Sequence, residues 1–188
     1  MKDELLFAVL FAFGLIVCIG VVIAAPEYRR ADSTRVPTVD TPGSIKTEHA
    51  ELHRELRSAT YVPGRTGQAA ERVATLLEGH FEREEEFAMP PLALLRPLAD
   101  GRVSVGMRDA LAMTDQLEAE LPRMLDEHKA IVVALDELAR AAHADGHQEV
   151  VVFVEKLKLH AQMEEEIFYP ASILVGRYLK LRALRAAR

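Results

Sequence analysis

Residues 80–90 read HFEREEEFAMP, and residues 160–170 read HAQMEEEIFYP. In both stretches a histidine stands four residues before a glutamate and ten residues before a proline. Each stretch is preceded, with a His-to-His separation of 31 or 32 residues, by a second histidine, in Glu48-His49 and in Glu127-His128. Unrelated surface runs would not keep this register, so the sequence indicates two related halves.

Apolar residues around these motifs recur at intervals of three and four, which is the period of an amphipathic helix. Breaks at Pro63-Gly64, Pro90-Pro91 and Asp145-Gly146 divide the region into four such helices, the third with a kink at Pro122. Short hairpin connections predict an all-α fold, an up-down-up-down four-helix bundle. The expected core stripes are Ile45, Leu52 and Leu56; Val73, Leu76, Leu77 and Phe87; Leu121, Leu125, Ile131, Leu135 and Leu138; and Phe153, Leu157, Ile167 and Phe168.

Ionisable residues interrupt every one of these stripes at positions where an apolar side chain is expected. Burying charged groups of this kind without a shared partner would cost several kcal/mol each. The pattern therefore predicts a common ligand for the whole set. Its members are His49, His80, Glu84, His128, His160 and Glu164.

The helical phase decides which glutamate of each Glu-Glu-Glu run can join a histidine. At about 100° per residue, positions four apart lie within about 40° of each other, whereas Glu85 and Glu165 swing about 140° away. We therefore expect the later glutamates to be solvated or to lie outside the ligand set. The distances of the four histidines from their hairpin turns, 13 to 15 residues, allow them to occupy one layer.

Four imidazoles and two carboxylates are too many for one tetrahedral zinc ion, but they suit two first-row ions bridged by both carboxylates. The internal repeat suggests that each hairpin serves one ion. A nitrogen-rich donor set with open positions favours Fe(II), and the choice of ligands does not exclude manganese or zinc.

The chain from about Ser44 to Tyr178 resembles the hemerythrin-like HHE cation-binding domain family, which has one histidine in helices 1 and 3 and His-x-x-x-Glu in helices 2 and 4. The resemblance implies two iron ions with oxo- or hydroxo- and carboxylate bridges, the latter from Glu84 and Glu164. It also implies a protein that binds O₂, NO or peroxide as carrier, scavenger or sensor. The alternatives are a di-iron peroxidase, catalase-like or NO-reducing enzyme, and an iron-responsive interaction module.

The sequence departs from the respiratory hemerythrins in helix 3. Where they have His-x-x-x-His, Met124 and Val132 stand four residues from His128. The only such pair is His49-x-x-x-His53 in helix 1, and His53 is either a further ligand or a histidine outside the ligand set. Helix 4 also has glutamate four residues after its histidine where those oxygen carriers have aspartate at five. Tyr169 either packs in the core or donates a hydrogen bond to a bound peroxide.

The amino-acid composition excludes several classes of protein. The 188 residues include 49% hydrophobic and 28% charged residues, which excludes a disordered chain. A single cysteine excludes a disulfide framework and a Cys-rich zinc module. A net charge of −6 argues against nucleic acid as a partner.

An uncharged run of 21 residues, Leu5–Ala25, is long enough to span a bilayer as a single helix. The alternative, a cleaved signal peptide, fits poorly because the run is long and follows Lys2-Asp3-Glu4 rather than a basic segment. We therefore expect an anchor at residues 1–25, a Pro-rich linker at 26–43 and the helical domain at 44–188.

Basic residues set the expected orientation of this anchor. Lys2 alone precedes it, whereas Arg29, Arg30 and Arg35 follow it, which predicts a single-pass inner-membrane protein with the domain on the cytoplasmic side. The basic C-terminal end of residues 177–188 is either a solvated helix end or a contact with the anionic inner leaflet.

Overall fold

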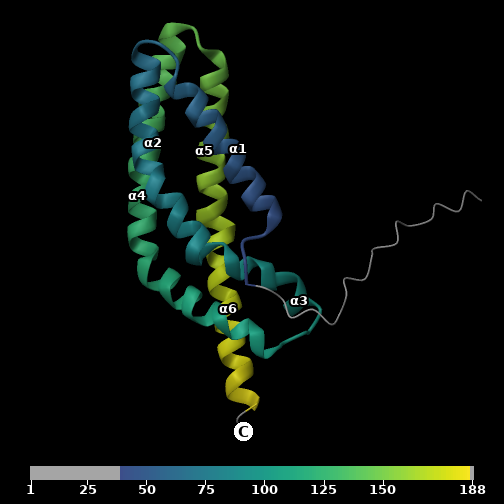
Figure 1. The fold of residues 1–188 in the computed structure, drawn as a ribbon. Coiled ribbons are helices and arrows are strands. Elements are labelled where there is room, and N and C mark those ends of the chain that lie inside the picture. Colours follow the sequence, from purple (N-terminus) through teal and green to yellow (C-terminus); the bar gives the residue numbers. More distant parts are fainter. Residues whose placement is uncertain (1–38, 187–188) are drawn as a thin grey trace, which may run out of the picture. The chain divides into compact units, whose positions relative to one another are not determined.

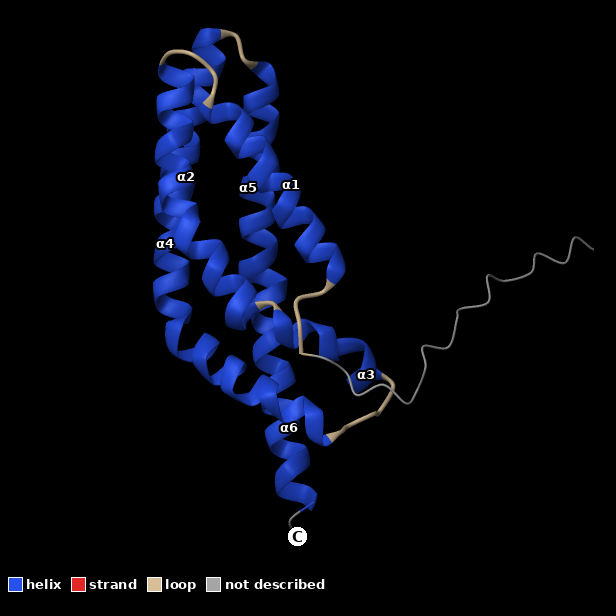
Figure 2. Cartoon of the chain, viewed as in Figure 1, coloured by secondary structure: helices blue, strands red, loops and turns tan. Residues whose placement is uncertain are grey.

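The structure is a computed structural model that describes residues 39–186, and within this range it is helical without strands (Figure 2). Two π-helical turns, Glu84–Ala88 and Glu164–Phe168, continue α2 and α5. Two 3-10 turns occupy Pro90–Leu94 and Val105–Arg108. The helices are α1 (Gly43–Thr60), α2 (Arg65–Arg83), α3 (Leu95–Ala99), α4 (Asp109–Asp145), α5 (Gln148–Met163) and α6 (Tyr169–Ala186).

Four long helical rods form the bundle, because α2 and α5 continue through their π-helical turns and α5 runs on into α6 (Figure 1). α1 and α2 make one antiparallel hairpin, and α4 makes the second with α5 and α6. α4 packs against α2, α5 and α6, while α1 lies against α2 and α5. The predicted four-helix bundle is confirmed, and the chain runs alternately up and down through it.

The second hairpin reverses at Gly146, which ends α4 with a φ of 83°. A left-handed conformation of this kind suits glycine because it lacks a Cβ atom. Asp145, just before it, accepts hydrogen bonds from Thr66 Oγ1 at 2.9 Å and from Arg65 Nη2 at 3.1 Å. These bonds join the turn of one hairpin to the start of α2 in the other.

The core consists of apolar clusters on both sides of a polar layer. One cluster extends from Leu52 towards the hairpin turns and includes Leu135 and Leu138, each 0% exposed. The other, on the opposite side of the layer, includes Ile45 and Met124. Burial of a leucine side chain contributes about 1.5–3 kcal/mol, so these clusters stabilise the bundle on either side of the polar layer.

Two residues of the expected stripes are exposed rather than buried. Leu76 is 41% exposed because its neighbour Leu77, about 100° away on the helix, faces inward instead. Ile167 is 54% exposed, because it lies within the second π-helical turn, which shifts the helical phase. Pro122 lies in the first half of α4, where it removes a backbone hydrogen bond. Figure 1 shows that this helix is bent.

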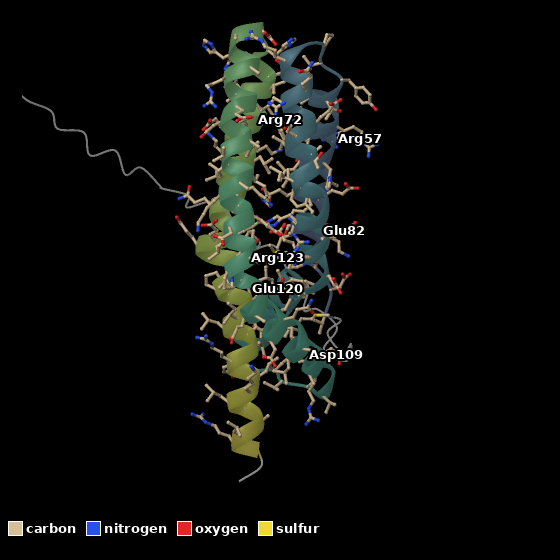
Figure 3. The ribbon with its side chains drawn as sticks, turned by 90° about the vertical axis from the view of Figure 1, so that its left-hand side faces the viewer. Arg57, Arg72, Glu82, Asp109, Glu120 and Arg123 are labelled. Carbon is tan, nitrogen blue, oxygen red and sulfur yellow. The ribbon has the colours of Figure 1, made fainter. Side chains whose placement is uncertain are left out.

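Charged side chains cover the outer surfaces of the rods, among them those labelled in Figure 3. Several form surface ion pairs, such as Arg72 with Glu137 at 3.4 Å. Among residues 39–186, no helix is long and apolar enough to cross a membrane. The expected anchor, residues 1–25, and most of the expected linker lie outside the described residues.

Candidate metal centre

The two π-helical turns stand at equivalent positions of the repeat, directly after each His-x-x-x segment. The Met89 amide, for example, donates to the Glu84 carbonyl at 2.8 Å, five residues back. Such turns insert about one residue into an α-helix and are frequent at functional sites. Here each begins at the glutamate that the helical phase predicts to face inward.

The inserted residue changes the helical phase of the residues after it. In an uninterrupted α-helix Tyr169, nine residues after His160, would lie about 180° from it, whereas Ile167 would share its face. The π-helical turn reverses this, so that Tyr169 is 0% exposed and Ile167 points to solvent. Phe87, the counterpart of Ile167, stays buried because a 3-10 turn packs against its π-helical turn.

The six donor residues of the sequence motif are buried in one layer, where each is at most 2% exposed. In a first group, His80 Nε2 lies 2.7 Å from His128 Nε2 and 3.2 Å from a Glu84 oxygen. Glu164 completes this group, with Oε2 3.5 Å from His128 Nε2.

A second group shares the same Glu164 carboxylate. Its other oxygen, Oε1, lies 2.8 Å from His160 Nε2 and 3.6 Å from His49 Nε2. In each group all the ligand atoms lie within 4.8 Å of one another, which is close enough for a single metal ion.

Each group draws its histidines from both hairpins, which corrects the expectation that each hairpin serves one ion. His80 on α2 joins His128 on α4, and His49 on α1 joins His160 on α5. The reason is the packing of the bundle, since α2 lies against α4, and α1 lies against α5. A twofold operation that exchanges the hairpins therefore exchanges the two groups.

Several of these donor atoms are buried and, among the described residues, have no hydrogen-bond partner. They are His49 Nε2, His160 Nε2, Glu84 Oε2 and Glu164 Oε1. Buried polar atoms in proteins are normally satisfied, and each orphan costs about 1–3 kcal/mol. Imidazole nitrogens and carboxylate oxygens that converge without partners fit cations at this position.

The buried histidines and glutamates of the layer shift one another's pKa values. Burial lowers the pKa of His80, but the contact and charge of Glu84, the hydrogen bond of Glu127 and the charge of Glu164 together outweigh burial and raise this pKa to about 9. Burial and repulsion by Glu164 raise the pKa of Glu84. Burial also opposes ionisation of Glu164, yet the close imidazoles of His128, His160 and His49 hold its pKa well below the ordinary value. Without metal, protons on imidazoles therefore balance the carboxylate charge, and metal ions must displace them.

These shifts predict that the metal-free protein loses stability between about pH 6.5 and 9. A histidine whose pKa is raised on folding stabilises fully below its unfolded pKa of 6.5 and no longer above its folded pKa, here about 9. At 1.36 kcal/mol per unit, His80 contributes about 3 kcal/mol, and the raised pKa values of His49 and His160 act in the same direction. Urea unfolding with a chelator present measures this loss.

The variant H80Q should show a shallower decline than the wild type over the same pH range. Replacement of the exposed His143 by glutamine is the matched control and should leave the decline unchanged. A wild-type unfolding free energy that stays constant from pH 6.5 to 9 would contradict the assignment.

Tyr169 breaks the symmetry of the centre. Its hydroxyl donates to Glu84 Oε1 and lies 3.3 Å from His128 Nε2, on which its ring also stacks. The corresponding residue of the first hairpin is Met89, which offers no hydroxyl. The predicted core packing of Tyr169 is confirmed, since the side chain is 0% exposed, and its hydroxyl is also bonded to a donor of the first group. A hydrogen bond from Tyr169 to a bound peroxide stays a prediction.

His53 lies in neither group. Its side chain is exposed, and its ring packs on Phe81 with centroids 4.5 Å apart. The reason is its position four residues after His49, one turn further along α1 and away from the layer of donors. The structure thus leaves His53 outside the ligand set.

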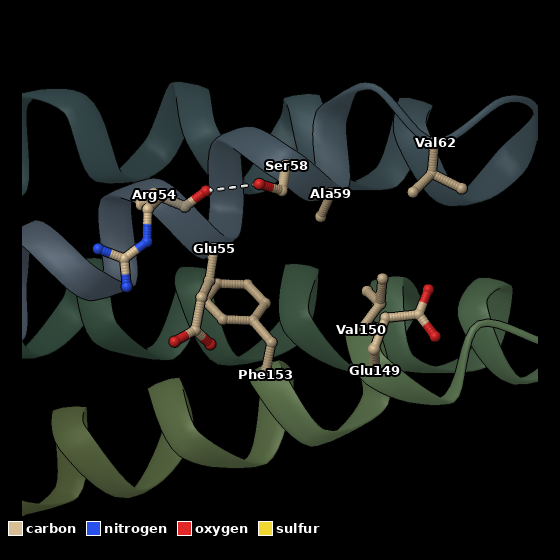
Figure 4. Close-up of a pocket in the computed structure, with 8 residues that line it drawn as sticks. All are labelled: Arg54, Glu55, Ser58, Ala59, Val62, Glu149, Val150 and Phe153. Atoms are coloured by element: carbon tan, nitrogen blue, oxygen red, sulfur yellow. Dashed lines mark hydrogen bonds between the residues drawn. The ribbon is translucent and has the colours of Figure 1, made fainter.

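A surface pocket between α1 and α5, shown in Figure 4, contains none of the six donors. The pocket lies between the layer of donor residues and the hairpin turns, and Phe153 of α5 is one of its lining residues. The candidate chemistry of the protein is therefore inside the bundle rather than in this groove. The residues that line the groove are Arg54, Glu55, Ser58, Ala59, Val62, Glu149, Val150 and Phe153.

The fold and the site define an all-helical bundle protein with a buried His/Glu cluster that could hold metal ions. Comparisons with protein-family models, curated proteins and solved structures find no match to this chain.

Proposed function

We propose that this chain is a hemerythrin-like protein that holds two iron ions and binds O₂, NO or peroxide as a carrier, scavenger or sensor. The observation that carries the proposal is the convergence of four buried imidazoles and two buried carboxylates, several with unpartnered donor atoms. Burying polar groups without partners costs free energy, and bound cations would supply the missing partners.

The proposed metal is iron because imidazole-rich sites with carboxylates suit Fe(II) and leave positions for another ligand. Manganese and zinc are the less favoured alternatives. Iron bound here would supply redox chemistry towards a small oxidising ligand. The apolar clusters on both sides of the layer favour a ligand of two or three atoms over a larger substrate.

Tyr169 favours the enzymatic alternative, a di-iron peroxidase, catalase-like or NO-reducing protein. Its hydroxyl is the one phenolic proton donor in contact with the donor set among the described residues. Such a group could deliver a proton to a bound ligand, which a reversible carrier does not require.

Anaerobic reconstitution with ferrous iron followed by stopped-flow spectroscopy tests the proposal. A carrier should give a stable spectrum on exposure to O₂ that reverses when O₂ is removed. An enzyme should instead consume peroxide or NO in many turnovers with an electron donor. Failure to bind two iron ions, or a protein whose iron responds to none of these ligands, would contradict the proposed function.

A further inference from the structure

We infer that an outer ring of four glutamates, Glu48, Glu85, Glu127 and Glu165, positions the four histidines for metal binding. Each places a carboxylate oxygen against the Nδ1 atom of one histidine, on the side opposite the metal layer. The inference rests on the proposed metal centre, and it assigns a role to residues outside the ligand set.

The distances support one partner for each histidine. Glu165 lies 2.8 Å from His128 Nδ1, and Glu127 lies 2.9 Å from His80 Nδ1. Glu85 lies 3.2 Å from His49 Nδ1. The fourth pair, Glu48 with His160 Nδ1 at 3.3 Å, is within ion-pair distance, although its geometry is not that of a hydrogen bond.

The four glutamates of the outer ring occupy equivalent positions in the two halves of the internal repeat. Glu48 and Glu127 directly precede the histidines of α1 and α4, whereas Glu85 and Glu165 directly follow the inward glutamates of the π-helical turns. The first pair reaches across to histidines of the other hairpin, and the second pair stays within its own hairpin. Four contacts that follow the same twofold operation as the ligands indicate an integral part of the site rather than incidental surface pairing.

The chemical role follows from the two nitrogens of imidazole. A neutral ring has one protonated nitrogen, and only the other one can bind a metal ion. A carboxylate at Nδ1 keeps the proton there, so that Nε2 is free to face the metal layer, and it increases the basicity of the ligand. All four Nε2 atoms do face this layer.

The glutamates suit this role because they remain partly in water. Their side chains are 25–47% exposed, whereas the four histidines are 1–2% exposed. Keeping the charge at the boundary avoids most of the desolvation cost of a buried carboxylate. Glu127 is held further by Arg83 at 2.5 Å and by Arg123 at 3.0 Å.

The test compares E85A and E165A with the matched controls E86A and E166A, which truncate an exposed glutamate one residue further on. Cobalt(II) is titrated into the full-length metal-free protein in competition with a chelating dye. Loss of one outer partner should weaken one of the two binding steps by about 10- to 100-fold. E165A should affect the group with His128, and E85A the group with His49. The cobalt absorption bands identify the affected group by comparison with H128A and H49A.

The glutamine variants E85Q and E165Q should fall between alanine and wild type, since an amide oxygen still accepts the Nδ1 proton but carries no charge. Circular dichroism of the metal-free variants should show the same helix content as in the controls, so that weaker binding does not report a lost fold. Affinities of E85A and E165A equal to those of E86A and E166A, with two ions still bound by the wild type, would overturn this inference alone. Equal weakening of both steps in each variant would also overturn it. A wild-type protein that binds no cobalt and no ferrous iron would refute the metal centre, and the outer ring with it.

Discussion

The double variant H49A/H80A should lose high-affinity binding of both metal ions, whereas H80A/H128A should keep one of them. Both variants remove two histidines, but they differ in how these are distributed over the two groups. H80A/H128A empties the first group and leaves His49, His160 and Glu164 intact. H49A/H80A removes one ligand from each group, although both histidines belong to the same hairpin.

Metal analysis after anaerobic loading with ferrous iron and removal of excess metal measures the stoichiometry. We expect two ions in the wild type, one in H80A/H128A and close to none in H49A/H80A. The control is H53A, which should bind two ions because His53 lies in neither group. If H49A/H80A kept one ion and H80A/H128A kept none, each ion would belong to one hairpin and the cross-hairpin grouping would be wrong.

The sequence specified the six inward donors because their spacing controls both phase and level. A histidine and a glutamate four residues apart share a helix face. Similar distances from the hairpin turns place the four histidines at one level of the bundle. It was therefore predictable from the sequence that Glu84 and Glu164, the first glutamates of their runs, face inward. Their burial at 0% and 1% follows from the same periodicity.

The pairing between hairpins was not predictable in the same way. Helical phase says which residues face inward, but it does not say which of two neighbouring helices they meet. When two hairpins associate, a helix of one hairpin can pack against either helix of the other. In this bundle α2 packs against α4. The expectation of one ion for each hairpin failed for this reason.

The π-helical turns were also beyond the sequence pattern, since one inserted residue leaves no signature in hydrophobic periodicity. Ile167, expected in the core, is exposed as a result. The outer ring, in contrast, had a visible signal. Glu48 and Glu127 repeat beside their histidines, and a repeat that includes polar neighbours indicates that these neighbours also have a structural or chemical role.

The two groups have different surroundings, so the two sides of the centre are chemically unequal. Glu164 contributes an oxygen to each group, whereas Glu84 belongs to the first group and accepts the hydroxyl of Tyr169. A small ligand near the first group would therefore meet a proton donor that the second group lacks. Glu164 is in turn the residue on which both groups depend.

Metal binding should raise the thermal stability of the protein by at least about 10 °C, and the variant E164Q should lose most of this increase. Ligand at about 1,000 times its dissociation constant stabilises a protein by about 4 kcal/mol for each site. For a domain of this size 1 kcal/mol corresponds to about 2–4 °C, so two occupied sites give a large shift. Glu164 supplies an oxygen to both groups, and its loss weakens both.

Differential scanning calorimetry of the metal-free and the ferrous protein under anaerobic conditions measures this shift. The control E166Q removes a charge from an exposed residue two positions further along and should keep the full increase. Circular dichroism should show the same helix content in both variants, so that a lost shift reports lost metal rather than a lost fold. An equal increase in E164Q and E166Q would mean that the bound ions do not depend on the shared carboxylate, and the two-group description of the centre would have to be abandoned.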